Sequence, residues 1–497
     1  MGHFLSQQLF PLIQNAAEKG IDEKINDIIK PAVDALGEII FYQPFASFGF
    51  EMPLVVLWLI VGAVFFTVYM GFINLRGVKH SLDLIRGKYD KPGDKGEVSH
   101  FQALVTALSG TVGLGNIAGV AVAISVGGPG ATFWIIFAGF LGMSSKFVEC
   151  TLGVKYRKIN SLGEVSGGPM YYLSEGLSKK GLPKLGKFLA VLFAVLCVGG
   201  SFGGGNMFQA NQSFAQLANV FPVFNGFGFV YGIFLALLVG IVIIGGIKKI
   251  AKVTDKLVPF MVGLYLMASL YIILANITNI GEAFSIILKG AFTPDGITGG
   301  IIGVLIVGFK RAAFSNEAGV GSAAIAHSAV KTEHPISEGL VSLLEPFVDT
   351  IVVCTMTALV LVFTGFATNT AGMEGSALTS AAFSSVVPWF KYVLLITIVL
   401  FAFSTMISWS YYGMKAFTFL FGDNKKMENL YKVIFLVFVV IGSSASLGAV
   451  IDFSDMMILA MGFPNILGLY LLSGEVKSDL REYFKQVKSG EIKKFKA

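Results

Sequence analysis

The sequence contains few charged residues. Asp, Glu, Lys and Arg make up 14% of its 497 residues, whereas about a quarter of the residues in a soluble globular protein are charged. Hydrophobic residues account for 54%, and the mean hydropathy is +0.74. This composition excludes an ordinary soluble domain, and we expect an integral membrane protein.

Cysteine and catalytic signatures are scarce as well. The three cysteines, Cys150, Cys197 and Cys354, lie in apolar runs, where free Cys usually behaves as a small apolar residue. Neither a disulfide framework nor a metal site is expected from them. The sequence has no HExxH or Walker-type pattern, so we do not expect an enzyme. The net charge of +6 belongs to loops and a tail, and no nucleic-acid partner is expected.

Long apolar runs are abundant. Segments of about 20 apolar residues recur from Met52 onward, each long enough to cross a hydrocarbon core of about 30 Å. They are too long and too uniformly apolar to be barrel strands. We therefore expect an all-α integral membrane fold with about eleven transmembrane helices. The predicted spans are 52–74, 101–126, 130–154, 186–218, 226–247, 254–277, 299–329, 337–367, 388–421, 430–449 and 453–473.

The distribution of Lys and Arg predicts the orientation. Basic residues cluster in alternate loops and in the tail, at 76–95, 155–187, 248–256, 425–432 and 477–496. The positive-inside rule then places the N-terminus outside and the C-terminus in the cytoplasm of a cell membrane. Residues 1–50 lack a signal peptide's basic start and predict an extracytoplasmic amphipathic helix. Residues 51–474 form the transmembrane domain, and the basic cytoplasmic tail 475–497 predicts a helix on the membrane surface.

Two predicted helices are interrupted by glycine. In "SGTVGLGNIAGV" (109–120), Gly110, Gly113 and Gly115 each weaken a helix by roughly 1 kcal/mol. A second interruption, "FKRAAFSNEAGVGSAAIAHSAV", follows at 309–330, an odd number of helices later. The two broken helices should therefore cross in opposite directions. This pattern predicts a five-plus-five inverted repeat, 101–277 and 299–473, behind one extra N-terminal helix.

Broken helices expose backbone groups that can bind ligands. Freed N–H groups around Leu114 and Gly115 would attract a carboxylate, and freed carbonyls of residues 109–112 would face a cation or an ammonium. A small zwitterion together with Na⁺ would satisfy both sets. The alternative is that the glycines only permit close helix packing, which is the interpretation we favour for Gly119. Asn116 either adds a side-chain oxygen to the site or caps the following half-helix.

Several motifs resemble a known transporter family. The stretches "TALSGTVGLGNIAGVAVAISVGGPGATFWI", "SGGPMYYL", "GGGNMFQANQ", "KRAAFSNEAGVGSAAIAHSA" and "STMISWSYYG" are similar to the alanine or glycine:cation symporters, also called sodium:alanine symporters. The resemblance runs from about residue 54 to about residue 474. It implies a leucine-transporter-like fold with two discontinuous helices. It also implies a secondary transporter that imports alanine or glycine with Na⁺ by alternating access.

The chemistry and the resemblance together give candidate site residues. The substrate candidates are Thr111, Gly113, Leu114, Gly115, Asn116, Phe208, Gln209, Phe314, Ser315, Met406 and Trp409. The sodium candidates are Ser109, Val112, Ser404 and Thr405, the last two implied by the resemblance. Asn206, Gln209 and Asn211 either reach the site or bond neighbouring helices. Met406 and Trp409 either form a pocket wall that admits only a small side chain or pack in the core.

Charged residues inside the spans need partners. We expect Lys310, Arg311, Glu317 and Asp349, with Glu345 nearby, to form an internal ion-pair network or gate. Lys146 and Glu149, three residues apart, should form a structural pair. A proton-coupled transporter remains an alternative, with Glu317 and His327 as titratable candidates. A channel is less expected, because the pseudo-symmetry lies within one chain.

Overall fold

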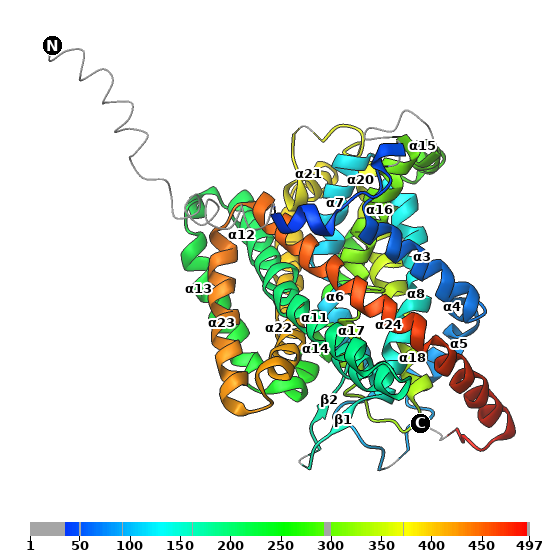
Figure 1. The fold of residues 1–497 in the computed structure, drawn as a ribbon. Coiled ribbons are helices and arrows are strands. Elements are labelled where there is room, and N and C mark those ends of the chain that lie inside the picture. Colours follow the sequence, from blue (N-terminus) through cyan, green and yellow to red (C-terminus); the bar gives the residue numbers. More distant parts are fainter. Residues whose placement is uncertain are drawn as a thin grey trace, which may run out of the picture.

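The computed structural model describes residues 35–48, 51–91, 93–161, 163–292, 300–370 and 372–494. The described residues form a helical bundle (Figure 1) whose two strands, β1 (Lys158–Ile159) and β2 (Val165–Ser166), pair antiparallel. Figure 1 shows β1 and β2 at one end of the bundle and α15 (Ile280–Phe292) at the opposite end. We call these the hairpin end and the α15 end.

The helices of the described residues follow one another along the chain on both sides of α15. Before α15 they are α3 (Leu54–Tyr69), α4 (Ile73–Arg76), α5 (Val78–Ile85), α6 (His100–Thr111), α7 (Val120–Gly127), α8 (Ala131–Lys155), α9 (Pro169–Tyr171), α10 (Leu177–Lys179), α11 (Pro183–Phe202), α12 (Phe208–Val220), α13 (Gly228–Ile243) and α14 (Gly246–Ala275). After α15 they are α16 (Gly300–Asn316), α17 (Ala323–His327), α18 (Pro335–Ser342), α19 (Leu344–Pro346), α20 (Thr355–Phe363), α21 (Gly375–Val386), α22 (Phe390–Phe421), α23 (Lys425–Ser444) and α24 (Leu447–Ser489).

The predicted all-α membrane fold is confirmed. Each predicted span falls on one helix or on a run of consecutive helices. Seven helices in the described part of the chain are long and apolar enough to cross a membrane, or eight when one bent pair counts as a span. The 16-residue helices α3 and α13 are shorter but equally apolar.

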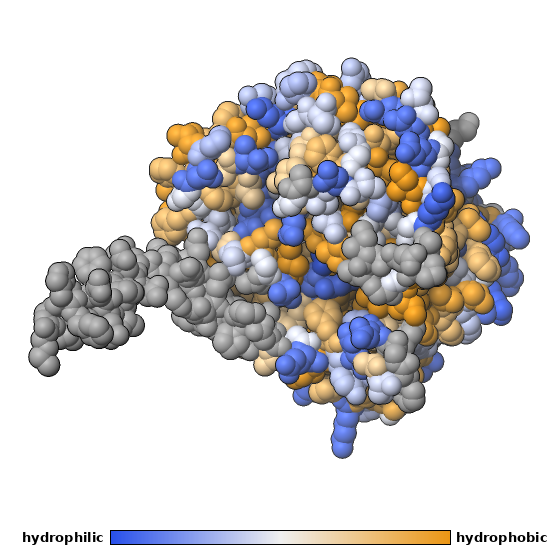
Figure 2. Space-filling model, turned by 90° about the horizontal axis from the view of Figure 1, so that it is seen from above, coloured by the Kyte–Doolittle hydropathy of each residue, from blue (hydrophilic) through white to orange (hydrophobic). Residues whose placement is uncertain are grey.

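The outer surface of the bundle is apolar. On α13, Phe229, Phe234, Leu237 and Ile241 each expose more than half of their surface. So large a set of exposed aromatic and aliphatic side chains is compatible with hydrocarbon and not with water. Viewed from the α15 end, hydrophilic and hydrophobic side chains are intermixed (Figure 2), as expected where the bundle meets the aqueous phase.

Both predicted breaks are present at the middle of the bundle. α6 stops at Thr111, and the helix resumes as a π-helical turn over Gly115–Gly119 that leads into α7, with a bend of 51°. α16 stops at Asn316 and α17 begins at Ala323. In Figure 1, α7 lies nearer the α15 end than α6, whereas α17 lies nearer the hairpin end than α16. The two broken helices therefore run in opposite directions, as the inverted repeat requires.

The tail is helical but is not a separate element. α24 continues through 43 residues to Ser489, well beyond the predicted span. Its final part contacts α5, where the His80 Nε2 and Tyr483 Oη atoms lie 2.9 Å apart and Lys494 donates to Asp83 at 3.1 Å. Hydrogen bonds from Lys88 and Lys494 lower the pKa of Asp83 to about 2. Most of the predicted N-terminal amphipathic helix lies outside the described residues, which are helical from 35 to 40.

Candidate functional site

The first break presents backbone amides in the middle of the bundle. The Gly113 N–H donates to Asn116 Oδ1 at 2.8 Å. The Leu114 N–H donates to Gln209 Oε1 of α12 at 3.1 Å. Side chains therefore satisfy two amides that an unbroken helix would have satisfied with its own carbonyls. Asn116 therefore accepts from an amide that precedes it, and it does not cap the half-helix that follows, which begins after Leu114 without a side-chain cap.

The residues at the end of α6 engage local backbone. The Thr111 hydroxyl donates to the Ala107 carbonyl at 3.2 Å, within its own helix. The Val112 N–H donates to the Leu108 carbonyl at 2.6 Å, and Val112 then leaves the helical conformation with ψ near 83°. What Thr111 and Val112 offer the site is therefore chiefly their main-chain groups.

The three amide candidates at the start of α12 and in the turn before it have different roles. Asn206 donates to the Phe435 carbonyl at 2.7 Å, and Asn211 donates to the Ala445 carbonyl at 2.6 Å. These bonds join the π-helical turn Gly203–Met207 and α12 to α23 and its C-terminal end, so the two amides connect neighbouring helices. Gln209 instead reaches the first break. Of the two alternatives left open by the sequence, the site role fits Gln209 and the helix-bonding role fits the other two.

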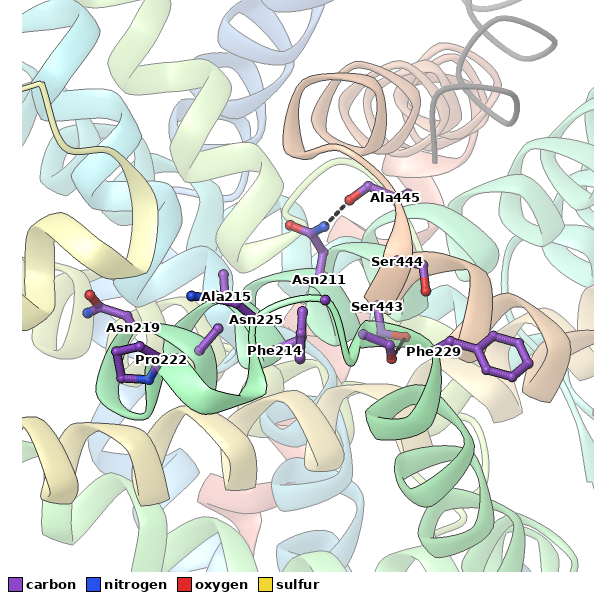
Figure 3. A pocket seen from close by; sticks show the side chains of 13 residues that line it. Asn211, Phe214, Ala215, Asn219, Pro222, Asn225, Phe229, Ser443, Ser444 and Ala445 are labelled. Carbon is purple, nitrogen blue, oxygen red and sulfur yellow. Dashed lines mark hydrogen bonds between the residues drawn. The ribbon is translucent and has the colours of Figure 1, made fainter. Parts of the chain in front are cut away.

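A surface pocket beside Asn211 is distinct from the break. Figure 3 shows the Asn211 amide pointing to Ala445 while Phe214, Asn219 and Phe229 lie around the pocket. Its lining comes from α12, the start of α13 and the end of α23. No residue of either broken helix lines it. The pocket is therefore not the site formed by the breaks.

Asp349 lies between the two breaks. It belongs to the π-helical segment Phe347–Cys354, and its side chain is fully buried. Asn116 Nδ2 donates to Oδ1 at 2.6 Å, while the Ser315 and Thr350 hydroxyls donate to Oδ2 at 2.9 and 2.7 Å. In the described part of the chain, no Lys, Arg or His forms an ion pair with this carboxylate. A buried carboxylate held only by neutral donors is costly, and a bound cation would offset its charge.

Phe314 of the second repeat packs on glycines of the first repeat. Phe314 of α16 meets Phe208 of α12 edge to face, with ring centroids 5.4 Å apart. A Cβ atom on Gly115 would lie 3.4 Å from Phe314, and one on Gly204 would lie 3.2 Å from it. Phe314 thus fills the space between the first break and the α11–α12 connection.

Trp409 forms a second aromatic surface, on α22. Its indole N–H donates to Glu317 Oε1 at 2.9 Å, and the side chain lies directly against Gly205. Met406, one turn earlier on α22, is fully buried. Trp409 connects the second break to the π-helical turn Gly203–Met207, so it is more than an isolated core residue.

The sodium candidates differ in what their side chains contact. The Ser109 hydroxyl donates to the Ser404 carbonyl at 2.6 Å, and the Ser404 hydroxyl donates to Phe401 at 2.9 Å. The Thr405 hydroxyl is buried and has no hydrogen-bond partner among the described residues. It lies against Gly113, where even a methyl group would collide with it. Of these hydroxyls, Thr405 is the one aimed unpaired at the first break.

The charged residues have partners other than those expected. Lys310 Nζ lies 2.9 Å from Asp455 Oδ2 of α24, and Arg311 also pairs with Asp455. In the described part of the chain, neither cation pairs with Glu317 or Asp349. The expected network of these four residues is therefore replaced by an Asp455 pair on the α15 side of the breaks. The sequence signal for Asp455 was an acidic residue inside the apolar run "FSDMMILAMGF".

A buried polar chain lies on the hairpin side of the site. Glu338 of α18 accepts from His100 at the start of α6, and its other oxygen lies 2.6 Å from His327 Nδ1. His327 Nε2 lies 3.3 Å from Glu345, which also pairs with Lys146 of α8 at 3.1 Å. These side chains hold α6, α8, α17 and α18 together at depth.

The expected pair of Lys146 with Glu149 is not formed. Lys146 pairs with Glu345, and Glu149 accepts a hydrogen bond from Asn465 of α24 at 3.1 Å. The same Asn465 amide donates to the Gly319 carbonyl in the second break at 2.9 Å. Glu149 therefore supports the broken backbone through Asn465.

Comparison with known proteins identifies the family of this chain. Residues 40–497 match the sodium:alanine symporter family. The chain belongs to this family. It is 42% identical over 447 residues to the sodium/alanine symporter AgcS of Methanococcus maripaludis, covering 89% of this chain and 96% of AgcS. It is 36% identical over 441 residues to the probable sodium/glutamine symporter GlnT of Bacillus subtilis, covering 88% and 89%.

The fold agrees with this membership. The crystal structure of MhsT in complex with L-phenylalanine superposes with a TM-score of 0.53 at 16% identity, covering 76% of this chain and 90% of MhsT. The leucine-transporter-like fold is thus confirmed. The chain is a multi-pass membrane transporter of the secondary class and not an enzyme.

Proposed function

We propose that the chain couples Na⁺ to the import of a small neutral amino acid, alanine or glycine, by alternating access. The observation that carries the proposal is the position of Asp349. Its buried carboxylate touches Asn116 of the first break and Ser315 of the second. A cation at this carboxylate would stabilise one arrangement of both broken helices, and that arrangement is also the one that holds the substrate.

Sodium has two sets of oxygen ligands available. Asp349 with the Ser315 hydroxyl offers hard oxygen donors, the kind that Na⁺ prefers. The unpaired Thr405 hydroxyl, beside Gly113, offers a second position with carbonyls from the end of α6. The first position lies between the two breaks, and the second lies at the first break.

The substrate would bind at the Leu114 N–H. In the structure the Leu114 N–H donates a hydrogen bond to Gln209 Oε1 at 3.1 Å. The substrate carboxylate would replace Gln209 as the acceptor of this hydrogen bond. Gln209 Oε1, no longer bonded to Leu114, would then lie beside the substrate and accept a hydrogen bond from its ammonium group. Phe314 and Trp409 would form the wall beside the substrate side chain, and such bulky residues favour a small one. Two relatives named for alanine and for glutamine support an amino-acid substrate within the family.

Closure on either side of the site uses different residues. Lys310, Arg311 and Asp455 form the barrier at the α15 side, which the basic loops predict to be the outside. His100 and Glu338 hold the start of α6 against α18 at the hairpin side. In this orientation the N-terminus is outside and the C-terminus is in the cytoplasm. Each barrier must separate in turn during one cycle.

The driving force is sufficient for accumulation. One charge moving through 100 mV yields about 2.3 kcal/mol, which corresponds to a concentration ratio of roughly fifty before any Na⁺ concentration gradient is added. One Na⁺ for each neutral amino acid therefore supports uptake against a gradient.

Uptake into proteoliposomes tests the proposal. Radiolabelled alanine is offered with an inward Na⁺ gradient, an inward H⁺ gradient or no gradient, and protein-free vesicles serve as the blank. We expect accumulation with Na⁺ only, competed by excess glycine. Accumulation driven only by H⁺ would overturn sodium coupling. Sodium-driven uptake of another amino acid, without alanine or glycine, would overturn the substrate assignment.

A further inference from the structure

Glu317 has an unusual backbone and a specific partner. It lies in the second break with φ of 55°, and only one other described non-glycine residue, Phe72, has positive φ. This conformation costs a residue with a Cβ atom about 1–2 kcal/mol, so the surrounding contacts must hold it. Its carboxylate is buried and receives two hydrogen bonds, from the Trp409 indole N–H at 2.9 Å and from the Ser322 hydroxyl.

These contacts do not describe an ion-pair gate. In the described residues no Lys, Arg or His lies within ion-pair distance of Glu317, and the two cations nearest in sequence pair with Asp455. The Ser322 hydroxyl donates to the Glu317 carboxylate from within the same broken segment. Among the described residues, the one hydrogen bond from this carboxylate to another transmembrane helix is with the indole of Trp409.

The indole is fixed on its other side by glycine. A Cβ atom on Gly205 would collide with the Trp409 side chain, and one on Gly200 would lie 3.5 Å from the ring. The adjacent Gly204 packs in the same way against Phe314. The Trp409 indole is therefore oriented by one hydrogen bond to Glu317 and packs against Gly200 and Gly205. Trp409 and Phe314 thus pack on adjacent glycines of one turn.

We propose that Glu317 is a positioning residue that sets the upper limit on substrate side-chain size by holding the Trp409 indole against the Gly203–Met207 turn. The inference rests on the proposed amino-acid transport and adds its size selection. Because Glu317 lies within the second break, a movement of that break also moves the indole. The limit on substrate side-chain size therefore depends on the conformation of the second break.

The test measures discrimination between two side-chain sizes. Inhibition of sodium-driven alanine uptake by valine is compared with inhibition by glycine, in wild type and in Glu317→Gln and Trp409→Phe variants. The valine side chain has three carbon atoms more than that of glycine, and even one extra methylene in a close pocket is discriminated by roughly tenfold or more. We expect each variant to reduce the valine-to-glycine discrimination about tenfold while Na⁺ dependence is retained. The double variant should lose no more than either single variant, because both remove one interaction.

A matched control and a second readout separate positioning from folding. Glu374→Gln removes an exposed carboxylate at the start of α21 and should leave discrimination unchanged. Thermal unfolding in detergent is measured for every variant. If Glu317→Gln does not fold, Trp409→Phe and Glu317→Asp carry the test.

The outcomes distinguish the two claims. Unchanged discrimination in folded Glu317→Gln and Trp409→Phe, or a double variant that adds the two single effects, overturns the positioning role while sodium-driven uptake stands. Absence of sodium-driven alanine or glycine uptake by the wild type overturns the proposed function, and the inference with it.

Discussion

Asn116 of the first break donates a 2.6 Å hydrogen bond to Asp349, a fully buried carboxylate that also accepts from the second break. This contact joins two segments that are more than two hundred residues apart in the sequence. It gives the two repeats a shared charged group at the middle of the membrane. Any ligand that changes the charge near Asp349 therefore acts on both broken helices at once.

Gln209 should bind substrate, whereas Asn211 should not. Gln209→Leu removes the acceptor beside Leu114 and is expected to weaken alanine binding about tenfold or more, since a hydrogen bond to a charged group contributes about 1.5–3 kcal/mol. Asn211→Leu, on the same helix, removes a bond to Ala445 and should lower the unfolding temperature without changing affinity. Equilibrium binding of labelled alanine measures the difference, and equal losses of affinity would contradict the assignment.

Gly115 should tolerate no branched side chain. A Cβ atom there already contacts Phe314 at 3.4 Å, so Gly115→Val would fill the space by which a carboxylate approaches. We expect loss of alanine binding in a protein that still elutes as a folded species in detergent. Gly119→Ala is the control, because its Cβ atom would meet only the Leu114 carbonyl, at 3.9 Å. Retained binding in Gly115→Val would place the site elsewhere.

Replacing Thr405 should lower sodium affinity more than substrate affinity. Thr405→Ala removes an unpaired hydroxyl beside the first break and should lower sodium affinity about tenfold or more. Alanine affinity at saturating sodium should change little. Thr397→Ala, on the same helix, removes a hydroxyl that donates to its own backbone and serves as the control. Equal losses of sodium and alanine affinity would argue against a sodium role.

The sequence predicted the parts of the fold that depend on local composition. Apolar runs located the helices, and clustered glycines located both breaks, because an unbroken helix tolerates few glycines. Gln209 could be nominated, since an amide at membrane depth needs a partner. Its assignment over Asn206 and Asn211 required the structure, because three amides on one helix face different neighbours.

The partners of charged residues could not be predicted. Lys310 and Arg311 lie close in sequence to Glu317, yet both pair with Asp455, which is on a helix far along the chain. Lys146 likewise pairs with Glu345 in place of Glu149. Helix spacing identifies which residues share a face, but ion pairs between helices depend on how the helices are arranged in three dimensions.

Lys146 should be essential for stability. Lys146→Met leaves Glu345 buried without its cation, and breaking a buried pair in this way costs about 3–5 kcal/mol. The expected result is a large fall in the unfolding temperature in detergent. Lys155→Met breaks partly exposed pairs with Glu475 and Asp479, for which we expect a loss of about 1 kcal/mol or less. Equal stability of the two variants would contradict the burial argument.

The central claim is that Asp349 supplies the charge that binds the coupling cation. The most direct measurement is binding of labelled Na⁺ to purified wild type and to Asp349→Asn, with and without alanine. Asn retains the shape and an acceptor for Asn116, and Asp452→Asn, an exposed position on α24, controls for loss of a carboxylate. We predict that Asp349→Asn loses the alanine-dependent increase in Na⁺ binding and that Asp452→Asn retains it. An unchanged increase in Asp349→Asn would contradict the account.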